Sequence, residues 1–269
     1  MNEYTAAHEQ NRRAWDQLVR DKQRFTRPAR DEDLQDPLKT VDAAGWLGGN
    51  IRGLELLCLA AGGGRQSALY AAAGASVTVV DISGAMLELD REVATERKLD
   101  VRTVEASMDY MPMFPNAAFD VVIHPVSTCY VPDIMKVFSE VARVTRPGGV
   151  YISQHKTPTS LQSSNTPSPN GYEITEVYYR TDPLPPVIGS RLREEGTLEY
   201  LHRWEELIGG MCRAGFVIED LFEPMHAEDD SDTGDFAHRC TYLAPYVRMK
   251  ARRTGNAEKL RPQSTIITS

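Results

Sequence analysis

This sequence of 269 residues lacks the features that mark several common protein classes. Its formal net charge is -8, whereas nucleic acids and anionic membrane surfaces are bound by clustered lysine and arginine. No apolar run approaches the roughly 18 residues that a transmembrane helix needs. Residues 1–18 are polar with a helical pattern, so we expect no signal peptide. We therefore expect neither nucleic acid nor a membrane as the main partner.

Cysteine is scarce as well, and the four that occur form no C-x-x-C pair. Disulfide-rich folds and zinc sites need cysteines at short, regular spacings, so we expect a reduced, cytoplasmic protein with no metal site. Cys129 lies at the start of a predicted helix, where the helix dipole can lower the pKa of a thiol. The competing interpretation, which we favour, is that Cys58, Cys129, Cys212 and Cys240 are small buried apolar side chains.

The apolar residues follow a regular alternation of two patterns. Five runs are predicted as buried strands because they are apolar or β-branched over strand length, namely residues 54–60, 76–81, 99–106, 119–124 and 150–155. Helical spacing follows several of them, from Gly64 to Ala73, after Ser83 and after Asp133. In the second of these helices Asp90 shares a face with apolar side chains. The alternation predicts right-handed βαβ units and a parallel sheet.

The N-terminal part has a different character. Residues 1–49 are predicted to form a helical cap, with an amphipathic helix over 5–24, a connection over 27–42 and a short helix over 43–49. Trp15 in the first helix either packs in the core or closes over a ligand.

Residues 156–202 are rich in Pro, Ser, Thr and Asn and interrupt the alternation. We expect an insertion that acts as a substrate lid, because binding residues favour loops on a rigid scaffold. Within it, 171–180 is predicted as an exposed strand that pairs with 196–202. Aromatic residues in and beside the insertion either line a substrate pocket or form the core of this hairpin: Tyr172, Tyr178, Tyr179, Tyr200 and Trp204.

The remainder of the core sheet is expected over residues 203–253. Its predicted elements are a helix over 203–214 and strands over 215–222 and 240–252. Pro245 would confine the last strand to an edge or a bulge, because proline cannot donate to a strand ladder. Residues 254–269 are predicted to be a polar, disordered tail.

The turn after the first predicted strand contains Gly62, Gly63 and Gly64. Glycines let a ligand approach the backbone, and the amides of the following helix start would point toward that ligand. Asp81 ends the next strand, where an acid can accept the hydroxyl hydrogens of a ribose. The competing interpretation is a tight turn with Asp81 as a helix cap. A dinucleotide fingerprint would need glycine or alanine where Ser67 stands. A dinucleotide and S-adenosylmethionine both remain candidates.

Four segments extend this pattern: "ELLCLAAGGG", "VVDIS", "EASMDYMPMFPNAAFDVV" and "EVARVTRPGGVYIS". Through them the sequence resembles the class I S-adenosylmethionine-dependent methyltransferases over about residues 50–155. The resemblance implies a doubly wound, Rossmann-like α/β fold with a mostly parallel seven-stranded sheet, N-terminal helices and a proline-rich insertion after strand five. It also implies an enzyme that uses S-adenosylmethionine, with S-adenosylhomocysteine as product, to methylate oxygen, nitrogen or sulfur of a small molecule.

The resemblance implies that one set of residues binds the cofactor: Ala60, Ala61, Gly62, Gly63, Gly64, Gln66, Asp81, Ile82, Met86, Ser107, Met108, Asp109, His124 and Pro125. Asp81 would hold the ribose, and Ile82 and Met86 would lie beside the adenine. The sequence departs from the family pattern at Cys58, which replaces an acid. It departs again at Ala60, which replaces a glycine, and at Ser107, which replaces an aspartate.

A methyl group on a sulfonium is already electrophilic, so a base is needed only when the acceptor must lose a proton. His124 is the first candidate for this base, and His155 and His202 are weaker ones. The competing interpretation is that these histidines only pack around the cofactor. Three other functions stay open: a nucleic-acid or protein methyltransferase, an NAD(P)-dependent oxidoreductase and a non-catalytic binding protein. The sequence does not determine the oligomeric state.

Overall fold

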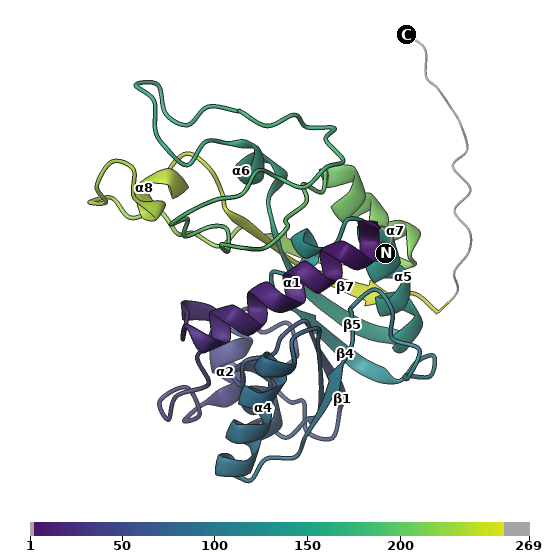
Figure 1. Ribbon diagram of the computed structural model, residues 1–269. Helices are drawn as coiled ribbons and strands as arrows, with labels where there is room; N and C mark the ends of the chain where they lie inside the picture. Colours follow the sequence, from purple (N-terminus) through teal and green to yellow (C-terminus); the bar gives the residue numbers. More distant parts are fainter. Residues whose placement is uncertain (1–2, 256–269) are drawn as a thin grey trace, which may run out of the picture.

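The computed structural model describes residues 3–255 (Figure 1). Its strands are β1 (Glu55–Leu59), β2 (Ser76–Asp81), β3 (Val101–Glu105), β4 (Phe119–His124), β5 (Thr145–Lys156), β6 (Phe216–Phe222) and β7 (Tyr246–Arg253). Its α-helices are α1 (Glu3–Arg20), α2 (Pro37–Val41), α3 (Gln66–Ala72), α4 (Gly84–Arg97), α5 (Ile134–Val144), α6 (Pro158–Gln162), α7 (Gly210–Arg213) and α8 (Phe236–Cys240). Short helical turns form η1 (Arg24–Thr26), η2 (Thr128–Tyr130) and the π-helix η3 (Glu205–Gly209).

The seven strands form one sheet in the order β3-β2-β1-β4-β5-β7-β6. All neighbours are parallel except β7, which runs antiparallel to both β5 and β6. The chain moves outward from β1 to β3 and then returns to place β4 on the other side of β1. Ligands of such sheets bind beyond the carboxyl ends of the strands at this reversal of order. The predicted doubly wound, mostly parallel fold is confirmed.

Both faces of the sheet are covered, which explains the continuous apolar runs in the sequence. Leu56, Leu57, Cys58 and Leu59 of β1 are all fully buried. Alternate residues face opposite sides, so Leu57 and Leu59 pack in the cluster that includes α5, while Leu56 and Cys58 pack in a cluster with Tyr70 of α3. The sequence showed strands without amphipathic alternation because no face of β1 meets water.

Helix α1 runs between the sheet and the insertion (Figure 1). It is fixed to both sides by polar side chains. Asn11 donates to the carbonyl oxygens of Tyr130 and Leu198 at 2.8 and 3.1 Å and accepts from the Leu198 amide at 2.7 Å. Asp16 accepts from the Ser83 hydroxyl at 2.7 Å, at the start of α4. Helix α1 therefore lies against the segments that follow β2 and β4.

Several sequence predictions about the flanks were wrong. Residues 43–49 form turns rather than a helix, and α2 lies in the segment expected to be a connection. Residues 171–180 form no strand with 196–202; only isolated bridges occur there, such as Ser163 with Ile174. The last strand begins at Tyr246, so Pro245 lies outside it, and β7 is an interior strand rather than an edge. Most of the tail predicted over 254–269 lies outside the described residues.

The glycine-rich loop between β1 and α3 is fixed to α4. The carboxylate of Asp90 accepts hydrogen bonds from the amides of Gly63 and Gly64 at 2.9 and 3.1 Å and from the hydroxyl of Ser67. A Cβ on Gly64 would stand 2.8 Å from the Leu89 carbonyl oxygen, and its φ is +73°. Gly64 is therefore required by the close approach of α4.

Ala60, the first residue after β1, has a φ of +47°. This left-handed conformation suits glycine and costs a residue with a Cβ about 1–2 kcal/mol. Its amide donates to the Val80 carbonyl oxygen at 2.7 Å, which holds the residue in place. Ala60, which replaces the glycine of the family pattern, is thus accommodated at the cost of backbone strain.

We expect Ala60→Gly to raise the free energy of unfolding by up to about 1 kcal/mol, because relief of strain exceeds the added entropy of the unfolded chain. Ala61→Gly is the matched control. Ala61 has no positive φ, so the same change should lower stability by about 0.5–1 kcal/mol. Urea denaturation measures both. Equal losses in the two variants would contradict the strain at Ala60.

We expect Asp90→Ala to lower the free energy of unfolding by about 2–4 kcal/mol, because three buried donors lose their acceptor. Glu88→Ala on the same helix is the control, since the Glu88 side chain is 58% exposed and should change stability by less than about 0.5 kcal/mol. Denaturant unfolding compares the two. A loss at Asp90 no larger than at Glu88 would contradict its role in fixing the loop.

Candidate cofactor and acceptor site

A cavity of about 890 Å³, called the main cavity below, lies at the carboxyl ends of β1, β2, β3 and β4. This volume is in the upper part of the range of roughly 300–1,000 Å³ typical of small-molecule sites. Eleven of the residues predicted to bind the cofactor line it: Ala60, Ala61, Gly62, Gly63, Gln66, Asp81, Ile82, Met86, Ser107, Met108 and Pro125. The ends of four separate strands therefore converge on one cavity, as a doubly wound sheet requires.

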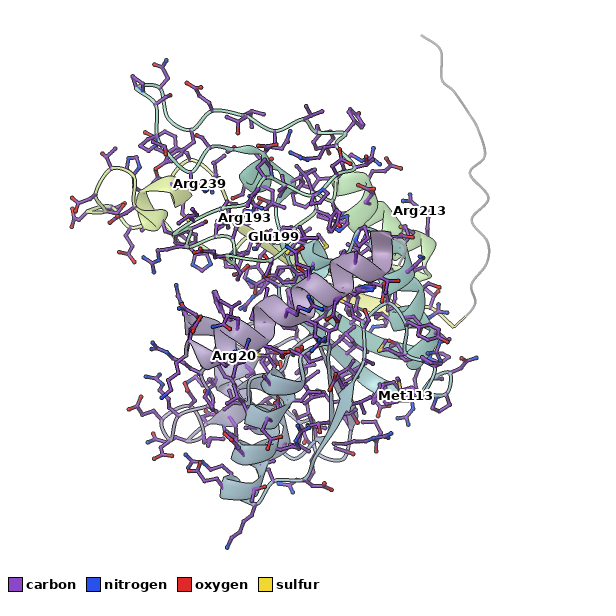
Figure 2. The ribbon with its side chains drawn as sticks, in the orientation of Figure 1. Arg20, Met113, Arg193, Glu199, Arg213 and Arg239 are labelled. Atoms are coloured by element: carbon purple, nitrogen blue, oxygen red, sulfur yellow. The ribbon has the colours of Figure 1, made fainter. Side chains whose placement is uncertain are left out.

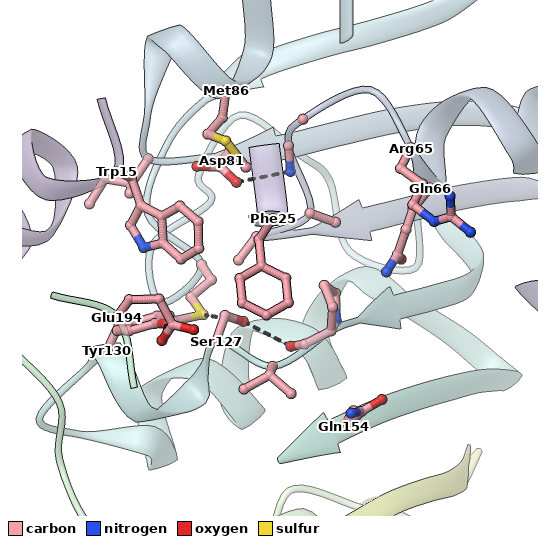
Figure 3. A pocket seen from close by; sticks show the side chains of 18 of the residues that line it. Trp15, Phe25, Arg65, Gln66, Asp81, Met86, Ser127, Tyr130, Gln154 and Glu194 are labelled. Carbon is pink, nitrogen blue, oxygen red and sulfur yellow. Dashed lines mark hydrogen bonds between the residues drawn. The ribbon is translucent and has the colours of Figure 1, made fainter. Parts of the chain in front are cut away.

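Asp81 is the buried acid of the main cavity. One oxygen of its carboxylate accepts from the Gly62 amide at 3.0 Å, and the other accepts from the Ser83 amide at 2.9 Å (Figure 3). Burial raises the pKa of Asp81 to about 6, against the lowering effect of these amides. A carboxylate offers about four lone-pair sites, so capacity remains for hydroxyl donors. A Cβ on Gly62 would stand 3.0 Å from Asp81 Oδ2, which explains a glycine there.

Gln66 at the start of α3 has an unsatisfied atom. Its Oε1 is buried without a hydrogen-bond partner among the described residues, and the side chain lines the main cavity (Figure 3). Buried polar atoms in native proteins are nearly always paired, so this amide points to a ligand.

Three residues predicted to bind the cofactor lie outside the lining of the main cavity. Gly64 faces α4, as described above. Asp109 accepts from the Ser107 hydroxyl at 2.5 Å and lies 3.3 Å from Nε2 of His8. His124 is 1% exposed, and its Nδ1 lies 2.8 Å from the Tyr151 hydroxyl. Contact of these three residues with the cofactor therefore stays a prediction; Nε2 of His124 is buried and has no hydrogen-bond partner within residues 3–255.

The predicted bases also lie outside the lining of the main cavity. Burial lowers the pKa of His124 to about 3, so its imidazole stays neutral at pH 7. His155 is buried between the hydroxyls of Thr128 and Ser153, and burial lowers its pKa as well. His202 donates from Nε2 toward the carbonyl oxygens of residues 128 and 131, each at 3.0 Å. His155 and His202 thus contact the segment after β4, and the base role of the three histidines stays a prediction.

The aromatic residues expected to form a substrate pocket do not line the main cavity. Tyr178 packs against an apolar cluster of the insertion, and Tyr179 is 72% exposed. Tyr172 contacts His238 and Tyr242, Tyr200 is buried, and Trp204 packs on the main core. The insertion instead contributes Arg191 and Glu194 to the lining.

Other lining residues escaped the sequence analysis: Phe25, Tyr130, Gln154, Arg191, Glu194, His226, Phe236 and Tyr246. They come from short helices, from loops and from β5 and β7, and no sequence motif marks them. The sequence analysis left two roles open for Trp15, namely packing in the core and closure over a ligand. Trp15 lines the cavity, and its ring meets the Tyr130 ring edge-on at a centroid distance of 5.7 Å (Figure 3).

Two of the four cysteines are buried, whereas Cys240 is half-buried and Cys212 is exposed, so the prediction of a buried side chain is wrong for Cys212. Cys58 and Cys129 are buried, and burial raises the pKa of both thiols, so an activated thiol at Cys129 is wrong. Within residues 3–255, no group of three or more His, Cys, Asp or Glu side chains is arranged to hold a metal ion. In the same part of the chain, no helix combines the length and apolarity needed to cross a bilayer.

Comparison with known proteins identifies the family. The profile of the methyltransferase domain matches residues 57–153. An uncharacterized methyltransferase of Bacillus subtilis, YbaJ, is 36% identical over 177 residues, covering 64% of this chain and 69% of the relative. An S-adenosylmethionine dependent methyltransferase from Mesorhizobium loti has a TM-score of 0.62 at 21% identity, over 82% of this chain and 100% of that one.

A second solved structure extends the likeness to nearly the whole chain. Geranyl diphosphate C-methyltransferase from Streptomyces coelicolor has a TM-score of 0.61 at 17% identity, over 92% of this chain and 98% of that one. At this identity the likeness shows the fold, while the Bacillus relative and the domain profile show the family. The chain belongs to the class I S-adenosylmethionine-dependent methyltransferases.

Proposed function

We propose that this enzyme binds S-adenosylmethionine in the main cavity and transfers its methyl group to an oxygen, nitrogen or sulfur atom of a small molecule. The observation that carries the proposal is the buried carboxylate of Asp81, which borders the cavity beside the glycine-rich loop. An acid at the end of β2 in this position suits the two hydroxyl groups of a ribose.

The residues of the main cavity fit the whole cofactor. Ile82 and Met86 after β2, with Ser107 and Met108 after β3, supply apolar and polar surface for an adenine. The orphaned Oε1 of Gln66 can accept from the ammonium group of the methionine part. Ala60 to Gly63 expose backbone for close contact, because all four residues have either a methyl group or no side chain.

The fixed loop also argues against a dinucleotide. A pyrophosphate is bound by free amides at the helix start after the glycine turn. Here the amides of Gly63 and Gly64 already donate to the carboxylate of Asp90, which is 1% exposed. These two loop amides are therefore not free to donate to a phosphate. An anionic carboxylate beside the turn would repel a pyrophosphate, whereas a nucleoside without phosphates meets no such repulsion.

The bound cofactor supplies the electrophilic methyl group. The chain contributes orientation of the acceptor and exclusion of water, which convert a bimolecular encounter into reaction within one complex. Trp15 and Phe25 approach the cavity from the N-terminal segment, and the Phe25 carbonyl oxygen would lie 3.4 Å from a Cβ on Gly63. The segment around Phe25 therefore lies directly over the glycine-rich loop and can shield the site from solvent.

We expect Asp81→Ala to weaken binding of S-adenosylhomocysteine by about 1–3 kcal/mol, because hydrogen bonds to a charged acceptor are lost. Asp120→Ala is the control, because Asp120 lies near the amino end of β4, where its carboxylate accepts from the Glu55 amide, and it is outside the lining of the main cavity. Calorimetric titration measures both. Unchanged affinity in Asp81→Ala would mean that the ribose lies elsewhere.

The affinity for S-adenosylhomocysteine is expected to fall as the pH is lowered below about 6, the pKa to which burial raises Asp81. Hydroxyl groups that donate to the carboxylate favour its charged form, so the pKa in the complex is lower than in the free enzyme. Binding then releases a proton below pH 6, and affinity rises with pH up to about 6 and is flat above it.

Titrations of the wild type and of Asp81→Asn across this range check the pH effect. The variant should show a weaker pH dependence, which separates Asp81 from Asp90, whose pKa burial also raises to about 6. An affinity of the wild type that increases on acidification would contradict the assignment.

Thermal unfolding with S-adenosylhomocysteine and with NADH separates the proposed enzyme from an oxidoreductase. We expect stabilisation by S-adenosylhomocysteine alone. Stabilisation by NADH alone would refute the proposal. Incubation of a metabolite extract with methyl-labelled cofactor then identifies the acceptor; label transferred to carbon would correct the class of accepting atom, and label that stays on the cofactor would indicate binding without catalysis.

A further inference from the structure

A buried ionic network borders the main cavity away from Asp81. The ammonium group of Lys156, at the end of β5, lies 2.9 Å from Glu194 Oε2 and 3.0 Å from Glu199 Oε2. Arg193 lies 3.3 Å from Glu199. The side chains of Lys156 and Glu199 are 1% and 0% exposed, so neither contacts solvent. Figure 2 shows Arg193 and Glu199 together above α1.

Glu194 is the member of this network that reaches the main cavity. Its Oε2 accepts from both the Lys156 ammonium and the Tyr130 hydroxyl. Its Oε1 accepts no hydrogen bond from any residue within 3–255. The side chain is 12% exposed, and Figure 3 places it beside Tyr130, on the side of the cavity where Trp15 lies. One oxygen is thus used to fix the carboxylate, and the other remains for a donor that the described chain does not supply.

A second unsatisfied atom belongs to the same cavity. His226 lines it, and its Nε2 is buried without a hydrogen-bond partner among the described residues. Burial, together with Arg248 and Arg24, lowers the pKa of His226, so its imidazole is neutral and one ring nitrogen can accept. Its ring lies 5.5 Å from that of Tyr246, which also lines the cavity.

An outer hollow of about 1050 Å³ between α1 and residues 189–196 joins the main cavity. The two share Trp15, Arg24, Phe25, Arg191 and Glu194. A small molecule that approaches the cofactor through this hollow passes Glu194. Aromatic rings at the junction offer apolar surface for the body of such a molecule.

From these contacts we propose that Glu194 recognises the methyl acceptor through a hydroxyl or ammonium group that donates to Oε1, with His226 as a second polar contact. Lys156 and Tyr130 are positioning residues that hold the Glu194 carboxylate in place. The acceptor is a small molecule with an apolar or ring-bearing body and at least one such donor. This inference rests on the proposed function, because it names the substrate class of the same site.

The test uses the full chain saturated with S-adenosylhomocysteine and three probes of similar size: phenethylamine, 2-phenylethanol and phenylacetate. Their affinities are measured by calorimetry for the wild type, Glu194→Gln and Glu199→Gln. Glu199→Gln is the matched control, because it also removes a carboxylate from Lys156 but lies outside both cavities.

In the wild type we expect the ammonium and hydroxyl probes to bind more tightly than phenylacetate. Glu194→Gln should weaken the ammonium probe by about tenfold or more, because a charge-assisted hydrogen bond is lost. Glu199→Gln should lower the melting temperature but leave probe affinities unchanged. Glu194→Gln keeps an oxygen for Lys156 and Tyr130; if it nevertheless fails to fold, Glu194→Asp, which withdraws the charge by one methylene, should weaken the same probe to a smaller degree.

Equal probe affinities in wild type and Glu194→Gln, tightest binding by phenylacetate, or no binding of any probe would each overturn the inference. Titration with S-adenosylhomocysteine is run first and tests the proposed function independently of the probes. A wild-type chain that does not bind it contradicts the proposed function, whereas normal cofactor binding with an unchanged probe profile contradicts only the role of Glu194.

Discussion

Three consecutive backbone amides of the glycine-rich loop donate to two buried carboxylates, and the site depends on this arrangement. Gly62 donates to Asp81, and Gly63 and Gly64 donate to Asp90. Burial of a charge is costly unless it is hydrogen-bonded, and the raised pKa of both acids reflects that cost. Because Asp81 belongs to β2 and Asp90 to α4, these bonds fix loop, strand and helix as one unit.

In this arrangement the glycines have a packing role. Gly62 makes room for Asp81 and Met86, and Gly64 makes room for the backbone of α4. Both are needed for packing before any ligand arrives. The loop that results has its amides satisfied internally and presents small side chains and backbone to the cavity. It suits a nucleoside whose polar recognition comes from a strand-end acid, and it differs from a loop whose free amides bind phosphate.

Features of the fold that depend on residues close together in the sequence could be predicted. The continuous apolar runs of β1 and β2, the cap at Ser83 and the acid at Asp81 depend on neighbours in sequence, and the structure has each of them. Asp90 gave a usable signal, since an acid on the apolar face of a helix must find buried donors. Its partners were not identified because they lie on another element.

The acceptor end of the cavity had no such signal. Glu194 and His226 come from irregular segments. They reach β5 and β7 through contacts with Lys156 and Tyr246, which lie far from them in the sequence. The histidines predicted from their positions at strand ends lie outside the cavity lining for a related reason. A position at the end of a strand does not reveal which way the side chain points. His124 and His155 point into the packed layer around Tyr151 and Phe138. A residue that ends a strand reaches the cavity only if its side chain leaves the sheet on that side.

The most direct test of the account is a crystal structure of the enzyme with S-adenosylhomocysteine. The account predicts both ribose hydroxyls within hydrogen-bonding distance of the Asp81 carboxylate, with the amides of Gly63 and Gly64 still bound to Asp90. A nucleoside bound away from Asp81, or a loop that releases Asp90 to bind the ligand with its amides, would contradict it.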